Sequence, residues 1–297
     1  MSESKLRKRV FRATPQTANL SSNKIQGKVM PNSLRKASVR GTFYPSSCRK
    51  IKEQIDTFNQ AFKKYKIKKE IRSIQARALL VPHAGYVYSG FTANFAYRFV
   101  DTLKPKRVII IGPSHHFYFK GVSGSFYEAF ETPCGTVDVD TPYLFALAQK
   151  FNIGFQEKAH EKEHSTEVQL PFIKHYFPDT PVIELIYGEI HPQKLANIIV
   201  ALLQNPDNIV LISSDLSHFY PLDKANQLDN ICLSAVSTLD NNVLHKGCKA
   251  CGLLGIDAMI LASKKLKLKS KLLDYRTSAE AYGNKKSVVG YLSAMFY

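Results

Sequence analysis

The sequence lacks a hydrophobic run long enough to cross a bilayer. Its longest apolar stretches, such as NIIVALL at 197–203, are far shorter than the roughly 20 residues that a spanning helix needs. The opening stretch MSESKLRKRVFRATPQ has no apolar core of the kind that a secretory signal contains. We therefore expect no transmembrane segment and a cytoplasmic location.

Cysteine is scarce, and tryptophan is absent, although the lack of tryptophan excludes nothing. The cysteines are Cys48, Cys134, Cys232, Cys248 and Cys251. Five is an odd and low number for a chain of 297 residues. This count argues against a disulfide framework.

Acidic residues are also few, and the net charge is +17. Residues 1–36 hold nine Lys and Arg side chains against a single acid, Glu3, and are rich in Ser, Asn, Gln and Thr. This composition predicts a disordered basic tail. Such a tail could bind nucleic acid or an acidic membrane. We favour a solvated tail and do not expect nucleic acid as a partner, because no aromatic platform accompanies the charge.

The remaining residues, 37–297, alternate between helical and strand-like patterns with short connections. Strands are predicted at 78–82, 107–111, 181–188, 208–219 and 287–297. Helices are predicted at 48–66, 89–103, 141–151, 191–204, 223–240 and 252–266. The alternation predicts a single α/β domain with a mostly parallel central sheet and helices on both faces.

Three of the predicted strands run directly into histidine. LLVPHAGY ends in His83 and Tyr86. IIIGPSHH ends in Ser114, His115 and His116. VLISSDLSH ends in Ser213, Ser214, Asp215 and His218. Because the carboxyl ends of parallel strands lie at one edge of a sheet, we expect these groups to converge there.

A fourth polar segment, HEKEHSTEVQLPF, lies at 160–172. His164 and Glu167 would share one face of a helix, although Pro171 suggests a turn nearby. The first charged residues fit an exposed polar segment: Glu161, Lys162 and Glu163. His164, Ser165 and Glu167 are the better functional candidates.

The segment GCKACGLLG contains a C-x-x-C pair, Cys248 and Cys251. Such a pair can be a redox couple or half of a zinc site. No second C-x-x-C exists, which excludes a four-cysteine zinc ribbon. One thiolate that joins two imidazoles on a metal is a simpler interpretation, and this ligand set suits iron, copper or zinc. The residues alone do not choose between the two cysteines.

Serine hydrolysis is a competing interpretation of the same strand ends. Ser213, Ser214, Asp215 and His218 have the composition of a catalytic triad. We rank this chemistry low, because the sequence has no G-x-S-x-G elbow.

Seven motifs in order resemble the Memo family. They are RGTFYP, VPHAGYVYSG, GPSHH, EHSTEVQLPF, SSDLSHF, CGLLGI and VVGYLSAMF. The family includes the eukaryotic mediators of cell motility and the prokaryotic AmmeMemoRadiSam system protein B. The resemblance covers about residues 38–297 and implies a fold like that of class III extradiol dioxygenases.

The resemblance also implies a metal site, because some family members bind iron or copper through two histidines and one cysteine. The matching positions are His83, His115 and Cys251. Asp215 and His218 would then lie beside the metal, with His164 and Tyr86 lining the cleft. Iron or copper is expected, and zinc fits less well. The stretch after the cysteine, CGLLG, is less polar than in the eukaryotic members, which affects the expected pocket wall but not the cysteine.

Two functions follow as expectations. The first is a non-haem iron or copper protein with oxygen-dependent redox chemistry or a role in metal handling. Dioxygenase activity itself does not transfer, because the related dioxygenases use a carboxylate where this family has cysteine. The alternative is a non-catalytic module that binds a small molecule or peptide and works with AMMECR-type and radical SAM proteins.

Overall fold

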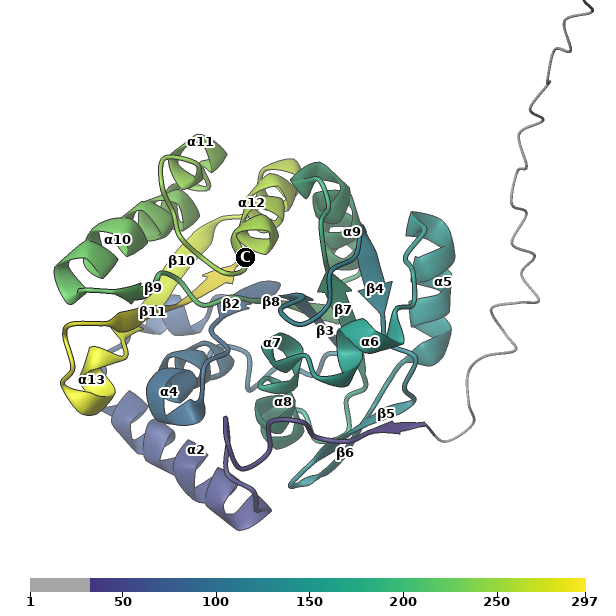
Figure 1. Cartoon of the computed structure of the whole chain (residues 1–297), viewed down its shortest axis with the longest axis horizontal. Helices are drawn as coiled ribbons and strands as arrows, with labels where there is room; N and C mark the ends of the chain where they lie inside the picture. The colour runs from purple at the N-terminus through teal and green to yellow at the C-terminus, as the bar shows by residue number, and fades with distance from the viewer. Residues whose placement is uncertain (1–32) are drawn as a thin grey trace, which may run out of the picture. The chain divides into compact units, whose positions relative to one another are not determined.

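Four parallel strands form the centre of the main sheet. The computed structural model describes residues 33–297 (Figure 1). The central strands, in spatial order, are β2 (Ala78–Val81), β8 (Asn208–Ser213), β3 (Arg107–Pro113) and β7 (Val182–Tyr187). They are rich in Val, Ile and Leu and almost wholly buried, as expected for strands that are covered on both faces.

Antiparallel strands complete the sheet on both sides. β11 (Val288–Phe296) pairs with β2, and β10 (Ser270–Thr277) pairs with β11. β4 (Val122–Gly124) pairs with β7, and the short β9 (His218–Tyr220) pairs with β11. The predicted parallel arrangement therefore describes the centre of the sheet, while every outer pairing is antiparallel.

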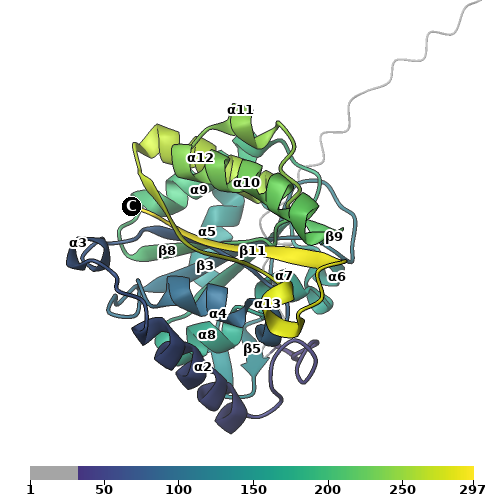
Figure 2. The same cartoon turned by 90° about the vertical axis from the view of Figure 1, so that its left-hand side faces the viewer.

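Helices cover both faces of the sheet, as the alternating pattern predicted. Figure 2 shows one layer formed by α9 (Pro192–Gln204), α10 (Leu222–Thr238) and α12 (Leu253–Leu266). The opposite layer contains α2 (Cys48–Lys63), α4 (Tyr86–Tyr97) and α8 (Leu170–Tyr176). The other helices are α3 (Lys69–Arg72), α5 (Thr141–Phe151), α6 (Glu157–Glu161), α7 (His164–Glu167), α11 (Asn241–Leu244) and α13 (Ala279–Tyr282).

A second, three-stranded sheet corrects the expected boundary of the basic tail. It contains β1 (Leu34–Arg35), β5 (Ala129–Thr132) and β6 (Gly135–Asp138). Arg35 is 2% exposed and forms ion pairs with Glu167 at 2.9 Å and Glu184 at 2.7 Å. The strand at 34–35 therefore belongs to the folded part of the chain. The rest of the expected tail, residues 1–32, lies outside the described residues.

Two disulfides contradict the expectation drawn from the cysteine count. Cys48 is bonded to Cys134, and Cys232 is bonded to Cys248. Cys248 and Cys251 are therefore not a redox pair with each other, and Cys251 is the one free cysteine of the five, all of which are described. The cysteine count could not show this pairing, because it does not say which cysteines lie close together in the fold. Cys48 and Cys134, for example, are 86 residues apart in the chain.

Among residues 33–297, no helix is long and apolar enough to cross a membrane.

Candidate metal centre

The carboxyl ends of three adjacent strands bring the predicted site residues together. His83 follows β2, Asp215 follows β8 and His115 follows β3, each two residues after the strand ends. β8 lies between β2 and β3, so the three groups meet at one edge of the sheet. This is the arrangement that the strand-end histidines predicted.

Three histidines form a cluster that could hold a metal ion. His83, His115 and His164 each offer a ring nitrogen, and these nitrogens all lie within 4.8 Å of one another. The ring of His164, at the start of α7, stacks on that of His115 with centroids 4.5 Å apart. Burial and then the charge of His115 lower the pKa of His83 to about 3. Burial and then the charges of His83 and His115 lower the pKa of His164 to about 4. Both imidazoles are neutral near pH 7, which is the form that binds metal.

Ser213 fixes which nitrogen of His83 carries the proton. The Ser213 hydroxyl donates to the carbonyl of Ser165 at 2.6 Å and accepts from Nε2 of Gln169 at 3.2 Å. The Ser213 hydroxyl has already donated its one proton to Ser165. The His83 Nδ1, which lies 3.0 Å from the Ser213 Oγ, must therefore be the donor in the hydrogen bond between them. The other ring nitrogen, Nε2, is therefore left with a free lone pair.

Glu163 fixes the proton of His115 on Nδ1 in the same way. Its Oε1 lies 2.8 Å from the His115 Nδ1, and its Oε2 accepts from the His115 backbone N–H at 2.6 Å. Burial would raise the pKa of Glu163. The hydrogen bonds and charge of His115, together with the backbone N–H of Ser165, outweigh burial and lower the pKa to about 2. A carboxylate on the far nitrogen of a histidine is the usual partner behind a metal-ligating imidazole.

The placement of Glu163 corrects its interpretation as an exposed residue. Its side chain is completely buried, while Glu161 and Lys162 are exposed as expected. The sequence offered one signal that we did not use, since Glu163 belongs to the same EHSTEVQLPF motif as His164.

Cys251 lies beside His83, in the turn just before α12. Its Sγ is 3.3 Å from the His83 Nε2 and accepts from the backbone N–H of Asp215 at 3.3 Å. Burial and then the charge of Asp215 raise the pKa of this thiol to about 12. The segment that carries Cys251 also lies close to Ser214, in the loop after β8. This approach requires Gly252, because a Cβ at residue 252 would lie 2.5 Å from the Cβ of Ser214.

Asp215 and His218 line a cleft next to the histidine cluster. The cleft has a volume of about 690 Å³, and His164 also forms part of its wall. Asp215 Oδ1 accepts from the backbone N–H of His83 at 2.8 Å, and burial raises the pKa of its carboxyl. Phe219, beside His218, is 75% exposed at the same cleft and has a left-handed φ of 64°.

Two other candidates lie away from this cleft. Tyr86 is buried and stacks on Phe172, and its hydroxyl donates to the carbonyl of Val168 at 3.0 Å. Glu167 is also buried, and accepts from the Tyr44 hydroxyl at 2.7 Å as well as from Arg35. At these positions, both side chains stabilise the fold through buried hydrogen bonds.

Replacing Tyr86 by Phe tests its structural role. We expect the free energy of unfolding to fall by about 1 kcal/mol, because the variant loses one buried hydrogen bond and leaves the carbonyl of Val168 without that donor. Metal content should stay at the wild-type value. Chemical denaturation and elemental analysis would measure the two quantities, and a loss of metal at unchanged stability would contradict this role.

Comparison with known proteins agrees with the family resemblance of the motifs. Residues 35–295 match the family described as Memo-like protein. The chain belongs to the Memo-like family. A MEMO1 family protein of Saccharolobus solfataricus is 35% identical over 280 residues, which cover 88% of this Memo-like chain and 99% of the relative. A MEMO1 family protein of Aquifex aeolicus is 32% identical over 273 residues, which cover 89% of this chain and 99% of the relative.

A solved structure supports the fold of this Memo-like chain. The crystal structure of an uncharacterized protein from Escherichia coli K12 aligns with a TM-score of 0.51 and 12% sequence identity. The alignment covers 74% of this chain and 100% of that protein. At this identity the likeness shows a shared fold alone.

Proposed function

We propose that this Memo-like protein binds one metal ion between His83, His115 and Cys251, with His164 facing the ion from the cleft. The observation that carries the proposal is the 3.3 Å approach of the Cys251 Sγ to the proton-free Nε2 of His83. Zinc-type bonds of about 2.0 Å to nitrogen and about 2.3 Å to sulfur, at a tetrahedral angle, put two such ligands about 3.5 Å apart. The two atoms are therefore spaced like ligands of one ion.

Iron or copper is the metal that we propose. Imidazole combined with thiolate suits both metals. Zinc in a structural role fits less well, because structural zinc is enclosed by four protein ligands and this site borders an open cleft. When bound, the metal would supply Lewis acidity and electron transfer. The protein would then be a metal-dependent oxidoreductase or a metal-handling protein.

The chain's own groups would orient the ligands and receive the substrate. Glu163 and Ser213 hold the Nδ1 atoms of His115 and His83, which leaves both Nε2 atoms for the metal. Asp215 lines the cleft, within reach of a bound molecule, where it would orient the substrate or move a proton. A cleft of about 690 Å³ suits a small molecule or a peptide side chain.

The same cleft also supports the alternative of a non-catalytic binding module. In that case, a peptide or partner protein would occupy the cleft between Phe219 and Tyr282, two exposed aromatic residues on its wall. Capture of such a partner would survive His83→Ala. The AMMECR-type and radical SAM partners stay predictions.

Elemental analysis of protein purified without oxygen tests the proposed function. We expect about one iron or copper per chain in the wild type and its loss in His115→Ala, His83→Ala and Cys251→Ser. His245→Ala is the matched control, because this histidine is 57% exposed and pairs with Asp257 instead. Wild-type metal content in both His83→Ala and Cys251→Ser would refute the ligand set. A metal-free wild type, even after reconstitution, would favour the binding module.

A further inference from the structure

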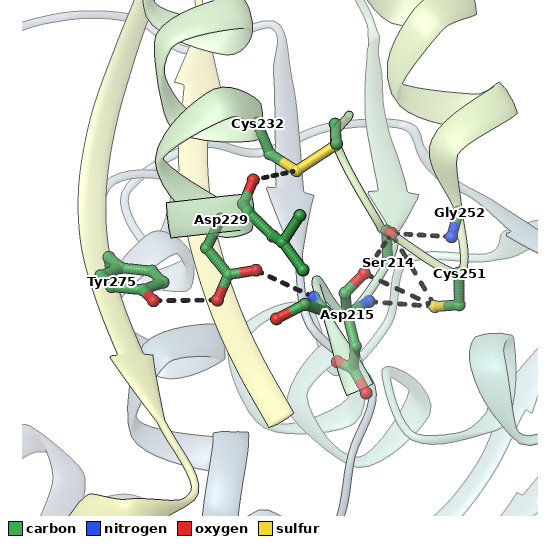
Figure 3. Close-up of a disulfide and its surroundings, with 10 residues drawn as sticks. Ser214, Asp215, Asp229, Cys232, Cys251, Gly252 and Tyr275 are labelled. Carbon is green, nitrogen blue, oxygen red and sulfur yellow. Dashed lines mark hydrogen bonds between the residues drawn. A yellow bond between two sulfur atoms is a disulfide. The ribbon is translucent and has the colours of Figure 1, made fainter. Parts of the chain in front are cut away.

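A disulfide holds the segment that carries Cys251. Cys232 in α10 is bonded to Cys248, three residues before Cys251 (Figure 3). Cys232 is completely buried and Cys248 is 4% exposed. Residues 248–252, between α11 and α12, adopt neither helix nor strand. The position of the Cys251 sulfur therefore depends on how this irregular segment is anchored.

The far end of the segment is anchored on the loop after β8. The backbone N–H of Cys251 donates to the carbonyl of Asp215 at 3.3 Å, and that of Gly252 donates to the Ser214 hydroxyl at 2.9 Å. These hydrogen bonds fix the segment to residues 214–215. The same loop carries Asp215, which lies next to the histidine cluster.

Helix α10 anchors this loop as well. Asp229, one turn before Cys232, accepts from the backbone N–H of Ser217 at 2.9 Å and from the Tyr275 hydroxyl at 2.8 Å. Figure 3 shows the disulfide and Asp229 on the same helix, each reaching toward a different loop of the site. One helix therefore positions both segments that flank the sulfur, by a carboxylate on one side and a covalent bond on the other.

We propose that the Cys232–Cys248 disulfide positions the sulfur of Cys251 for metal binding, and that reducing this disulfide with a dithiol weakens the site. The proposal rests on the function proposed above. In the reduction, the dithiol transfers two electrons and two protons to Cys232 and Cys248. The S–S bond breaks, each sulfur becomes a thiol, and the dithiol closes to its own disulfide. The segment then keeps its hydrogen bonds to the β8 loop but loses its covalent anchor on α10.

Binding of Co²⁺ to the full chain tests this inference, because a cobalt-bound thiolate has its own charge-transfer absorption. The oxidised wild type should bind Co²⁺ with this absorption, and Cys251→Ser should lack it. In Cys232→Ser/Cys248→Ser we expect about tenfold weaker Co²⁺ binding and a reduced thiolate absorption. A change in this absorption reports on the sulfur, whereas a general loss of stability would leave the spectrum of the folded fraction unchanged.

The second disulfide provides a matched control. Cys48→Ser/Cys134→Ser removes a covalent link between α2 and the β5–β6 turn, and should leave Co²⁺ binding unchanged. As a second route that needs no substitution, the wild type is reduced with a dithiol, freed of it by gel filtration under nitrogen and titrated with Co²⁺. The free thiol count should rise from one per chain, and Co²⁺ binding should weaken as in the double variant.

The outcomes separate this inference from the proposed function. The positioning role would be overturned if both the double variant Cys232→Ser/Cys248→Ser and the reduced protein bound Co²⁺ with the affinity and spectrum of the wild type. This result would not affect the proposed metal site. Five free thiols in the untreated protein would also overturn it. An oxidised wild type that binds no Co²⁺ would overturn both proposals.

Discussion

Glu163→Gln is expected to weaken metal binding by about 10- to 100-fold, although the residue touches no metal in the proposed ligand set. The Glu163 carboxylate accepts from both the ring and the backbone of His115, and from the backbone of Ser165. An amide keeps the size of the side chain but removes its charge, and points an NH₂ group at atoms that are themselves donors. The ring of His115 then loses the negatively charged partner that leaves its Nε2 free for the metal.

Glu161→Gln is the control for this prediction. Glu161 is exposed and lies two residues from Glu163, so the same chemical change there should leave metal affinity unchanged. Equilibrium titration with one metal, on variants shown to be folded by circular dichroism, would measure both affinities. Equal affinities in Glu163→Gln and the wild type would show that the carboxylate does not orient the His115 ring.

The meeting of His83, Asp215 and His115 could be predicted from the sequence because it depends on local patterns. Continuous runs of Val, Ile and Leu mark strands buried on both faces, and short helical connections imply that these strands are parallel. Parallel strands put their carboxyl ends at one edge, so any residue just after a strand has a known place. The three strand-end residues therefore needed no knowledge of side-chain contacts.

The different roles of Glu161 and Glu163 could not be predicted in the same way. Both are glutamates in one short charged stretch, and they differ only in what lies opposite them in space. Glu163 meets His115, which is 48 residues away in the chain, whereas Glu161 faces solvent. The pairing of Cys232 with Cys248 has the same cause, because composition does not encode which distant residues meet. The family resemblance chose Cys251 over Cys248, and the structure adds that Cys248 is already bonded.

Arg35→Met is expected to lower the free energy of unfolding by about 3 to 5 kcal/mol. Arg35 is 2% exposed and donates to Glu167 and Glu184, both of which are also buried. Methionine fills a similar volume but leaves the two carboxylates without their shared cation. Removing one partner of a buried ion pair is costly because the remaining charge stays out of water without compensation. Chemical denaturation at pH 7 would measure the loss.

Lys36→Met is the control, since this neighbouring side chain is 75% exposed and lies 4.0 Å from Glu131. Its effect should stay within about 0.5 kcal/mol. Equal small effects of both substitutions would show that the fold does not depend on residue 35.

The decrease in the free energy of unfolding that Arg35→Met causes should also become smaller in acid. Burial would raise the pKa of Glu184, but the charges of Arg35 and then His160 outweigh it, so the pKa is lowered. A carboxyl whose pKa is lowered by folding stabilises the fold above its unfolded pKa of about 4.5, and this stabilisation is lost as the pH falls below that value. Arg35→Met lacks much of this contribution already, so the wild type should lose more stability than the variant between pH 6 and pH 3. Parallel denaturation curves across this range would measure the gap, and a constant gap would mean that Arg35 acts by packing and not by its charge.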